Sequence, residues 1–296
     1  MVALYALGSA APAQSTQDDE TTRKLWDTAF GASARKPARA GRNSPRRTYR
    51  VATPRIPPAG VSGDSVVGVT VWRLRPSRDA DEGERMIVHE GSDAAEWIPE
   101  RVPGNAELAE GDRVRLSVEA ARTGYLYVID REQYADGTLG EPYLIFPTTR
   151  TLGGDNRVRA GRLVDIPGQE DSPPFFTLRR SRADQVGEVL SVIVTPAPLD
   201  ELQIGPQAQR LSAERVARWE KSWGAQTGRM ELSDGAGKGW TKEEKEAGAS
   251  GAHLLKASAP GPQTLYYRPG IKSDEPLLIN VRLQYRRRKV PPPPRR

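Results

Sequence analysis

The sequence contains no cysteine, and this absence removes several kinds of chemistry. Disulfides, thiolate nucleophiles and cysteine-ligated zinc all require that residue. Histidine is almost as scarce, because His89 and His253 are the only two and lie far apart in the chain. A histidine-based triad or a histidine-rich metal site is therefore hard to build. We predict a protein without catalytic, metal-binding or cofactor-binding residues, and without a cofactor.

Long apolar runs are also missing. No segment approaches the roughly 18–20 consecutive apolar residues that a membrane-spanning helix needs, so no transmembrane segment is expected in the mature chain. Hydrophobic residues make up only 37% of the chain, whereas glycine (28) and proline (25) are frequent. This composition predicts one compact domain with a large share of loops, linkers and disordered tails.

The first fourteen residues, MVALYALGSAAPAQ, form a short apolar stretch that ends in a small-x-small pattern at Ala11–Ala13. Signal peptidase recognises that pattern, although a basic segment before it is missing. We interpret residues 1–14 as the truncated end of an export signal. This predicts a periplasmic, outer-surface or extracellular protein. An ordinary alanine-rich terminus on a cytoplasmic protein is the alternative.

Basic residues are concentrated near the two ends of the chain. Residues 28–63 hold eight basic residues and no acid, and residues 276–296 hold seven basic residues and no acid. We expect these ends to be flexible and to contact anionic surfaces, with solvated linkers as the alternative. Between the first and last basic residues of the first run, Arg35 and Arg55, Tyr49 is the only aromatic residue. One aromatic residue is too few for base stacking, so no specific nucleic-acid binding is predicted. The prolines at 291–294 favour a polyproline II tail.

The stretch 111–147 is the most informative part of the sequence. Val114, Leu116 and Val118 alternate with polar residues, a period typical of a strand with one face on a core and one face in water. Residues 125–129 and 143–146 are apolar and rich in aromatic or β-branched side chains, so they predict two further strands. The short connections predict that the three strands form an antiparallel meander, with 125–129 in a central position.

Other runs of the same kind extend this prediction. Residues 66–74 are expected to form the first strand of the domain, and 83–89 to pair with it. Residues 97–99 are interpreted as a hydrophobic loop patch. The apolar run 189–194 predicts a second central strand. Residues 263–268 and 277–285 are expected to form a closing hairpin.

One helix is predicted over 211–223. Ser212 is a suitable N-cap, and Gly224 ends the pattern. Val216, Trp219 and Trp223 fall on one stripe, which typically packs on a sheet. A carbohydrate-stacking platform formed by the two tryptophans is the alternative.

Several features in 108–198 resemble the bacterial domain of unknown function 4384 (DUF4384) family. They are Gly111-Asp112, the run 124–128, the run 144–147 ending in Pro147, the segment 156–161, Ile166-Pro167 and the strand 189–194. The resemblance covers about a third of the chain. It implies a small β-rich domain of envelope-associated or multidomain bacterial proteins. It implies no established activity and no catalytic residues.

Acidic residues offer one weak metal motif. Residues 130–141 place acids where a calcium loop would, but Ala135 stands where a glycine is required, and strands flank the segment. An exposed hairpin loop is the favoured interpretation, with weak calcium binding as the alternative. Acid pairs could also serve a hydrolase of envelope polymer, but nothing in the sequence selects a pair.

The sequence thus predicts a mainly β protein, an antiparallel sandwich or barrel-like domain with one packed helix and disordered basic termini. Its expected core contains Val114, Leu116, Tyr125, Tyr127, Val128, Phe146, Val192, Trp219 and Trp223. The expected divisions are a signal at 1–14, a linker at 15–63, a β-domain at 64–200, a helical segment at 201–224, a mobile loop at 225–262, a hairpin at 263–286 and a tail at 287–296. We expect a non-catalytic binding or scaffolding module of the cell envelope that recognises a protein or an envelope polymer. An intracellular interaction module and a carboxylate-based hydrolase are the alternatives.

Overall fold

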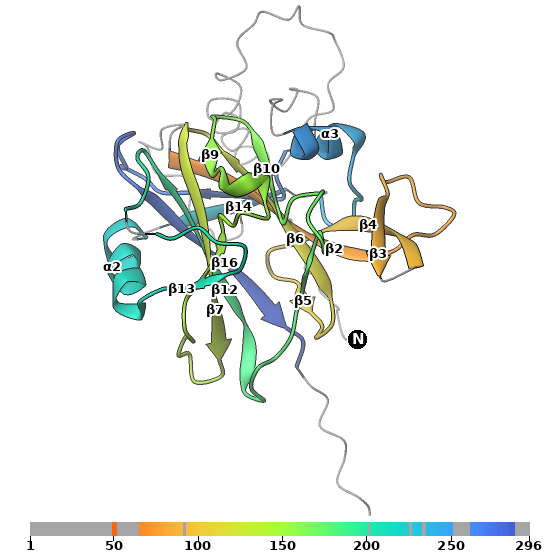
Figure 1. Cartoon of the computed structure of the whole chain (residues 1–296), viewed down its shortest axis with the longest axis horizontal. Coiled ribbons are helices and arrows are strands. Elements are labelled where there is room, and N and C mark those ends of the chain that lie inside the picture. The colour runs from red at the N-terminus through yellow and green to blue at the C-terminus, as the bar shows by residue number, and fades with distance from the viewer. Residues whose placement is uncertain are drawn as a thin grey trace, which may run out of the picture.

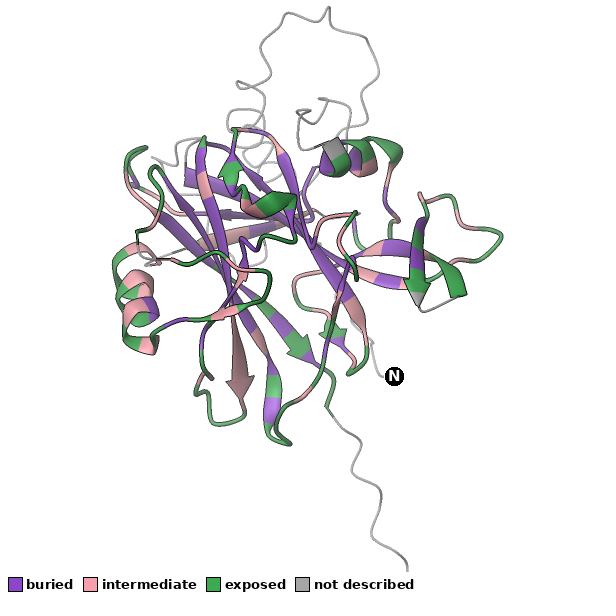
Figure 2. Ribbon diagram, in the orientation of Figure 1, coloured by how far each residue is buried: buried purple, intermediate pink, exposed green. Residues whose placement is uncertain are grey.

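The computed structural model describes residues 49–51, 65–90, 93–200, 202–224, 227–232, 235–250 and 261–287. These residues form two β-sheets that pack face to face, with the buried positions concentrated between them (Figures 1 and 2). The protein is mainly β and sandwich-like, as the sequence predicts, but the sheets do not close into a barrel. The described residues form two α-helices rather than the one predicted: α2 (Ala213–Trp223) and α3 (Lys242–Ser250).

Sheet A runs in the order β1-β14-β15-β2-β4-β3, and β6 pairs with the other side of β2 and with β10 and β11. Its strands are β1 (Tyr49–Val51), β2 (Val66–Pro76), β3 (Met86–Glu90), β4 (Asp93–Val102), β6 (Arg113–Ala120), β10 (Leu163–Ile166), β11 (Phe176–Thr177), β14 (Gly228–Leu232) and β15 (Thr264–Tyr267).

Sheet B runs in the order β13-β8-β7-β12-β16-β5, and β9 pairs with β7. Its strands are β5 (Glu107–Leu108), β7 (Gly124–Tyr134), β8 (Tyr143–Phe146), β9 (Arg157–Val158), β12 (Gln185–Thr195), β13 (Gln209–Arg210) and β16 (Leu277–Tyr285). All described pairs are antiparallel except β5 with β16. The central position predicted for the strands around 125–129 and 189–194 is confirmed, because β7 and β12 lie side by side in the middle of this sheet.

The core between the sheets is apolar. Among the predicted core residues, those buried here are Val114, Leu116, Val128, Phe146 and Val192. A second cluster on the outer face of sheet B contains Tyr127, which is buried, with Tyr125, Trp219 and Trp223 partly buried against it.

The predicted meander is wrong, because β6 lies in sheet A whereas β7 and β8 lie in sheet B. The short segment between β6 and β7 crosses from one sheet to the other. The expectation that the polar face of β6 lies in water is also wrong. Arg115, Ser117 and Glu119 are buried, because further chain segments cover the outer face of sheet A.

Three other expectations near the first strand are corrected. Residues 97–99 belong to β4 and not to a loop. The strand expected at 83–89 pairs with β4 and not with β2. Residues 49–51 form strand β1 inside the range expected to be a disordered linker, and they pair with β14. Part of the second basic end is also ordered, because residues 277–285 form strand β16. Residues 28–48, 52–63 and 288–296 and the proposed signal lie outside the described residues.

The later chain is more ordered than expected. The range 225–262 contains β14 and α3 where a mobile loop was predicted, because Met230 and Trp240 are buried. The predicted closing hairpin does not form, since β15 joins sheet A and β16 joins sheet B. Strands beyond residue 200 therefore complete both sheets, and the domain is not confined to 64–200.

Helix α2 begins as predicted. The Ser212 side chain accepts a hydrogen bond from the backbone N–H of Arg215, and Gly224 follows the last helical residue. Leu211 and Val216 pack with Leu278 on the outer face of sheet B. The stacked rings of Trp219 and Trp223, with centroids 5.4 Å apart, lie against the same cluster.

Candidate functional site

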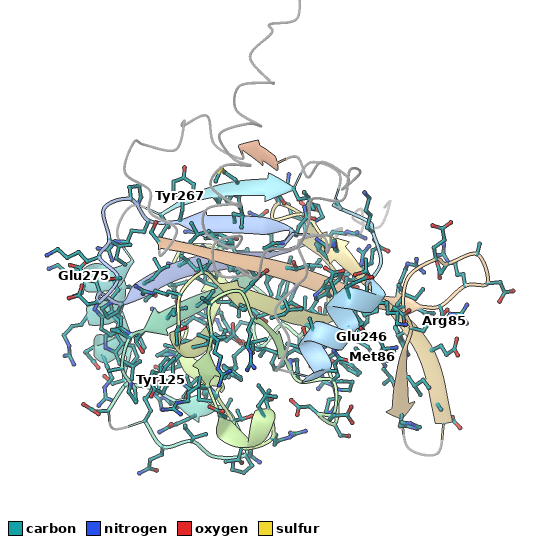
Figure 3. All side chains as sticks on the ribbon, turned by 90° about the horizontal axis from the view of Figure 1, so that it is seen from above. Arg85, Met86, Tyr125, Glu246, Tyr267 and Glu275 are labelled. Atoms are coloured by element: carbon teal, nitrogen blue, oxygen red, sulfur yellow. The ribbon has the colours of Figure 1, made fainter. Side chains whose placement is uncertain are left out.

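The β3–β4 hairpin projects from one end of sheet A (Figures 1 and 3). β3 is the last strand on this side, and no strand in the described part of the chain pairs with its outer edge. Alternation along β3 buries Met86 and Val88, whereas Ile87 and His89 are exposed. Ile87 is 61% exposed, more than any other large hydrophobic residue that the structure describes. Free strand edges of this kind bind extended peptides through main-chain hydrogen bonds.

A groove of about 440 Å³ borders this strand. Arg85, Met86, Ile87 and His89 line one side, and residues of the loop between β10 and β11, within 169–174, line the other. Trp240 and Lys245 complete the lining. Figure 3 shows Arg85 and Met86 at the base of the hairpin beside α3. The volume falls in the range of roughly 300–1,000 Å³ that is typical of ligand pockets.

Trp240 is held in the groove by backbone pairing with the hairpin. Its N–H donates to the carbonyl of Pro99 (3.0 Å), and its carbonyl accepts from the N–H of Glu84 (2.8 Å). Gly239 makes this approach possible, because a Cβ there would lie 3.1 Å from the Cα of Gly83. The Trp240 ring is buried, and its Nε1–H has no hydrogen-bond partner among the residues that the structure describes.

A buried charged network lies beneath Trp240. The Arg115 guanidinium stacks 4.8 Å from the Trp240 ring centroid and forms an ion pair with Asp165 (3.1 Å). Asp165 also accepts from the Ser117 hydroxyl (2.6 Å), which in turn accepts from the Trp72 indole N–H (2.8 Å). Burial lowers the pKa of Arg115, and the charge of Asp165 opposes that shift. Ser117, Asp165 and Arg115 are all buried, and their contacts hold the groove wall beneath Trp240.

Helix α3 closes over this network through a second buried pair. Glu244 forms an ion pair with Arg101 and accepts a hydrogen bond from the backbone N–H of Thr241 (3.1 Å) at the start of the helix. Burial raises the pKa of Glu244, while Arg101 opposes the increase. At the groove itself, Lys245 Nζ donates to the carbonyl of Arg85 (2.9 Å) and contacts Glu84 (3.2 Å). These contacts connect α3 directly to the base of β3.

A second hollow of about 260 Å³ lies on the other side of the loop between β10 and β11. Its lining is mostly apolar and includes Phe175, Phe176 and Pro173. Asp171 lines both hollows, and it is fixed by a hydrogen bond from the N–H of Gly168 (2.8 Å). The loop therefore separates two recesses on the same side of the molecule.

A separate group of carboxylates lies on the inner face of sheet B. Glu132 on β7 is directly opposite Glu188 on β12, and Asp130 lies two residues earlier on β7. Burial raises the pKa of Asp130, and the negative charges of Glu188 and Glu132 raise it further. Burial also raises the pKa of Glu188, although a hydrogen bond from the Tyr285 hydroxyl opposes the shift. Carboxyls with a raised pKa can act as general acids.

The calcium-like loop and the two histidines noted in the sequence lie in different parts of the chain. Within the predicted calcium-like loop 130–141, the Asp136 side chain accepts from the Thr138 N–H (2.9 Å), and Gly137 adopts φ +86°, as a tight turn requires. Among the described residues no group of three or more acidic or histidine side chains could hold a metal ion. His89 lines the groove, whereas His253 lies outside the described residues. No sequence pattern indicated Trp240, Arg101 or Lys245, which come together only because the α3 segment packs on β4 and β3.

Comparisons with known proteins return no match: no family model, no curated protein and no solved structure is similar to this chain. The resemblance to the domain of unknown function 4384 family therefore stays a prediction. In the part of the chain that the structure describes, the helices are too short or too polar to span a membrane.

Proposed function

We propose that this protein is a non-catalytic binding module that recognises an extended segment of a partner protein by adding it as a strand to β3. The observation that carries the proposal is the free outer edge of β3 beside the 440 Å³ groove and the exposed Ile87. An added strand would form main-chain hydrogen bonds with β3, while alternate side chains enter the groove.

Other sheet edges are less suitable. β1, β5 and β13 are only two or three residues long. β16 has a longer stretch without a described partner on one side, but the hollow beside Val281 and Leu283 measures only about 10 Å³. Among these described edge strands, β3 combines a free edge with a hollow large enough to accept side chains.

The cell envelope is the proposed location, and it rests on the signal-like residues 1–14 and on the basic ends. An intracellular interaction module is the alternative, and the groove would act in the same way there. Fractionation of the source cells with an antibody against the chain distinguishes the two locations.

The binding test uses the full chain and a display library of short random peptides. Selected peptides should protect the outward-facing amides among residues 86–90 from hydrogen exchange, because strand addition gives those amides new partners whereas the others already face β4. Ile87→Ala should weaken binding by about threefold or more, since about 1 kcal/mol of apolar contact is lost. The matched control is Ile204→Ala, at an exposed isoleucine on another loop (39% exposed), which should leave binding unchanged. Protection at other strands with none at β3 would refute the proposal.

A carboxylate-based hydrolase is the second candidate, favoured by the raised pKa values of Asp130 and Glu188. Incubation of the protein with envelope polymer fragments tests it. Turnover that is lost in both Asp130→Asn and Glu188→Gln would favour this alternative over a binding module.

A further inference from the structure

The projecting hairpin has an unusual charge. Residues 79–96 contain seven acidic residues and only one arginine. Three of these acids are already neutralised: Asp81 pairs with Arg75 (2.6 Å), Glu84 with Lys245 (3.2 Å) and Glu96 with Arg85 (2.7 Å). Two further acids of this segment, Asp79 and Glu82, are exposed.

Three exposed carboxylates have no ion-pair partner among the described residues. Asp79 and Glu82 lie in the segment that leads into β3, and Glu170 lies on the opposite side of the groove. The two cations that line the groove, Arg85 and Lys245, are engaged by Glu96 and Glu84. Arg78 beside Asp79 is one exposed cation in the same segment, so these three carboxylates still outnumber it, and a bound segment can supply the missing positive charge.

From this we infer that the segment bound at β3 is basic, with lysine or arginine at alternating positions of an extended peptide. This inference rests on the proposed function. Neighbouring strands lie about 4.8 Å apart, so side chains of an added strand reach both the β3 side chains and the opposite groove wall. Cations on such a strand would face Glu170 on one side. On the other side they would face Asp79 and Glu82 in the segment that leads into β3.

A strand from a basic segment already pairs with this sheet at its opposite edge. Tyr49–Val51 lies within the basic run 28–63 and forms β1 against β14. A basic sequence is therefore compatible with strand addition to sheet A. The partner that we infer for β3 has the same chemistry, a basic extended segment of another protein.

The test uses the full chain and three blocked peptides of about nine residues, long enough to span β3. Each carries valine at alternate positions, with lysine, serine or glutamate between the valines. We expect the lysine peptide to bind about tenfold more tightly than the serine peptide at low salt, because each exposed ion pair contributes a factor of about 1.4 to 5. The preference should disappear near 1 M salt, where the screening length is about 3 Å.

Matched variants separate local from overall charge. The triple variant Asp79→Asn, Glu82→Gln, Glu170→Gln should lose most of the preference for lysine. The control triple variant Glu107→Gln, Asp200→Asn, Asp274→Asn changes the net charge equally at exposed sites elsewhere and should keep the preference. An equal loss in both would overturn the inference, because binding would then reflect total charge only.

The outcomes also separate this inference from the proposed function. If all three peptides protect the β3 amides equally well, strand addition holds and the basic partner is refuted. If none protects β3, the proposed function itself fails. If peptide binding is blocked because the chain self-associates through β3, as sedimentation would show, the occupant is a second copy and the inferred partner is wrong.

Discussion

The outer faces of the two sheets are covered by helices that pack in different ways. On sheet B, Val216 of helix α2 and Leu211 just before it pack against Leu278 of β16 in an apolar cluster. On sheet A, helix α3 and the segment before it enclose two ion pairs, Arg101–Glu244 and Arg115–Asp165. An apolar cover is stabilised by burial alone. A charged cover is stable only while each charge keeps its partner, because an isolated buried charge is strongly unfavourable.

The largest expected effect comes from breaking the charged cover. Asp165→Ala leaves the Arg115 guanidinium buried without its carboxylate, and we expect the free energy of unfolding to fall by about 3–5 kcal/mol. Urea denaturation followed by circular dichroism measures this loss. The control is Glu96→Ala, which removes the exposed pair with Arg85 and should cost at most about 1 kcal/mol. A loss below 1 kcal/mol for Asp165→Ala would show that Arg115 finds water or another partner.

A smaller effect is expected on the apolar side. Val216 is completely buried under α2, and Val216→Ala should lower the free energy of unfolding by about 1–3 kcal/mol through lost burial and a residual cavity. The same denaturation experiment measures it. The control is Ala217→Gly on the exposed face of the helix, which should cost about 1 kcal/mol through helix propensity alone. If Val216→Ala lowered the free energy of unfolding more than Asp165→Ala does, the contrast between the two covers would be reversed.

The smallest effect concerns Asp130, a half-buried carboxylate that forms no described ion pair, whereas Asp165 is paired with Arg115. Asp130 Oδ1 has no hydrogen-bond partner in the described structure, and burial raises the pKa of Asp130. The folded state therefore keeps this proton to a higher pH than the unfolded state does. Its contribution to stability is present at acidic pH and is lost as the pH rises through the raised pKa.

Asp130→Asn removes this dependence. We expect the variant to melt above the wild type near pH 8, and the difference to shrink towards pH 4. Asp136→Asn is the control of opposite sign, because hydrogen bonds from Thr138 lower the pKa of Asp136 and its contribution is lost as the pH falls. Parallel melting curves for wild type and Asp130→Asn across this range would contradict the assignment.

The difference between the two covers also explains what the sequence could reveal. The stripe of Val216, Trp219 and Trp223 has a helical period and a cap, so α2 could be predicted together with its packing face. The β6 residues Arg115, Ser117 and Glu119 alternate with apolar ones, and this pattern is the same for a solvated face and for a face buried under ion pairs. Burial of that face depends on partners as distant in sequence as Asp165 and Trp240.

The groove could be predicted only in part, for the same reason. The period of two around Ile87 indicates a strand, and the acidic surplus of 79–96 is visible in the sequence. The pairing of β3 with β4 depends on register, and the groove depends on α3, which lies in a segment rich in glycine, alanine and lysine. That composition predicts disorder. Only the burial of Trp240, seen in the structure, explains why the segment is ordered.

Strand order has a consequence for synthesis of the chain. β2, near the start of the domain, pairs with β15, and β12 pairs with β16, the last described strand. Ile279 and Val281 from β16 are part of the core between the sheets. Neither sheet can therefore be completed on the ribosome before the final strands have been translated. We expect the nascent chain to expose an unpaired edge of β2 until β15 has been translated, and an unpaired edge of β12 until β16 has been translated.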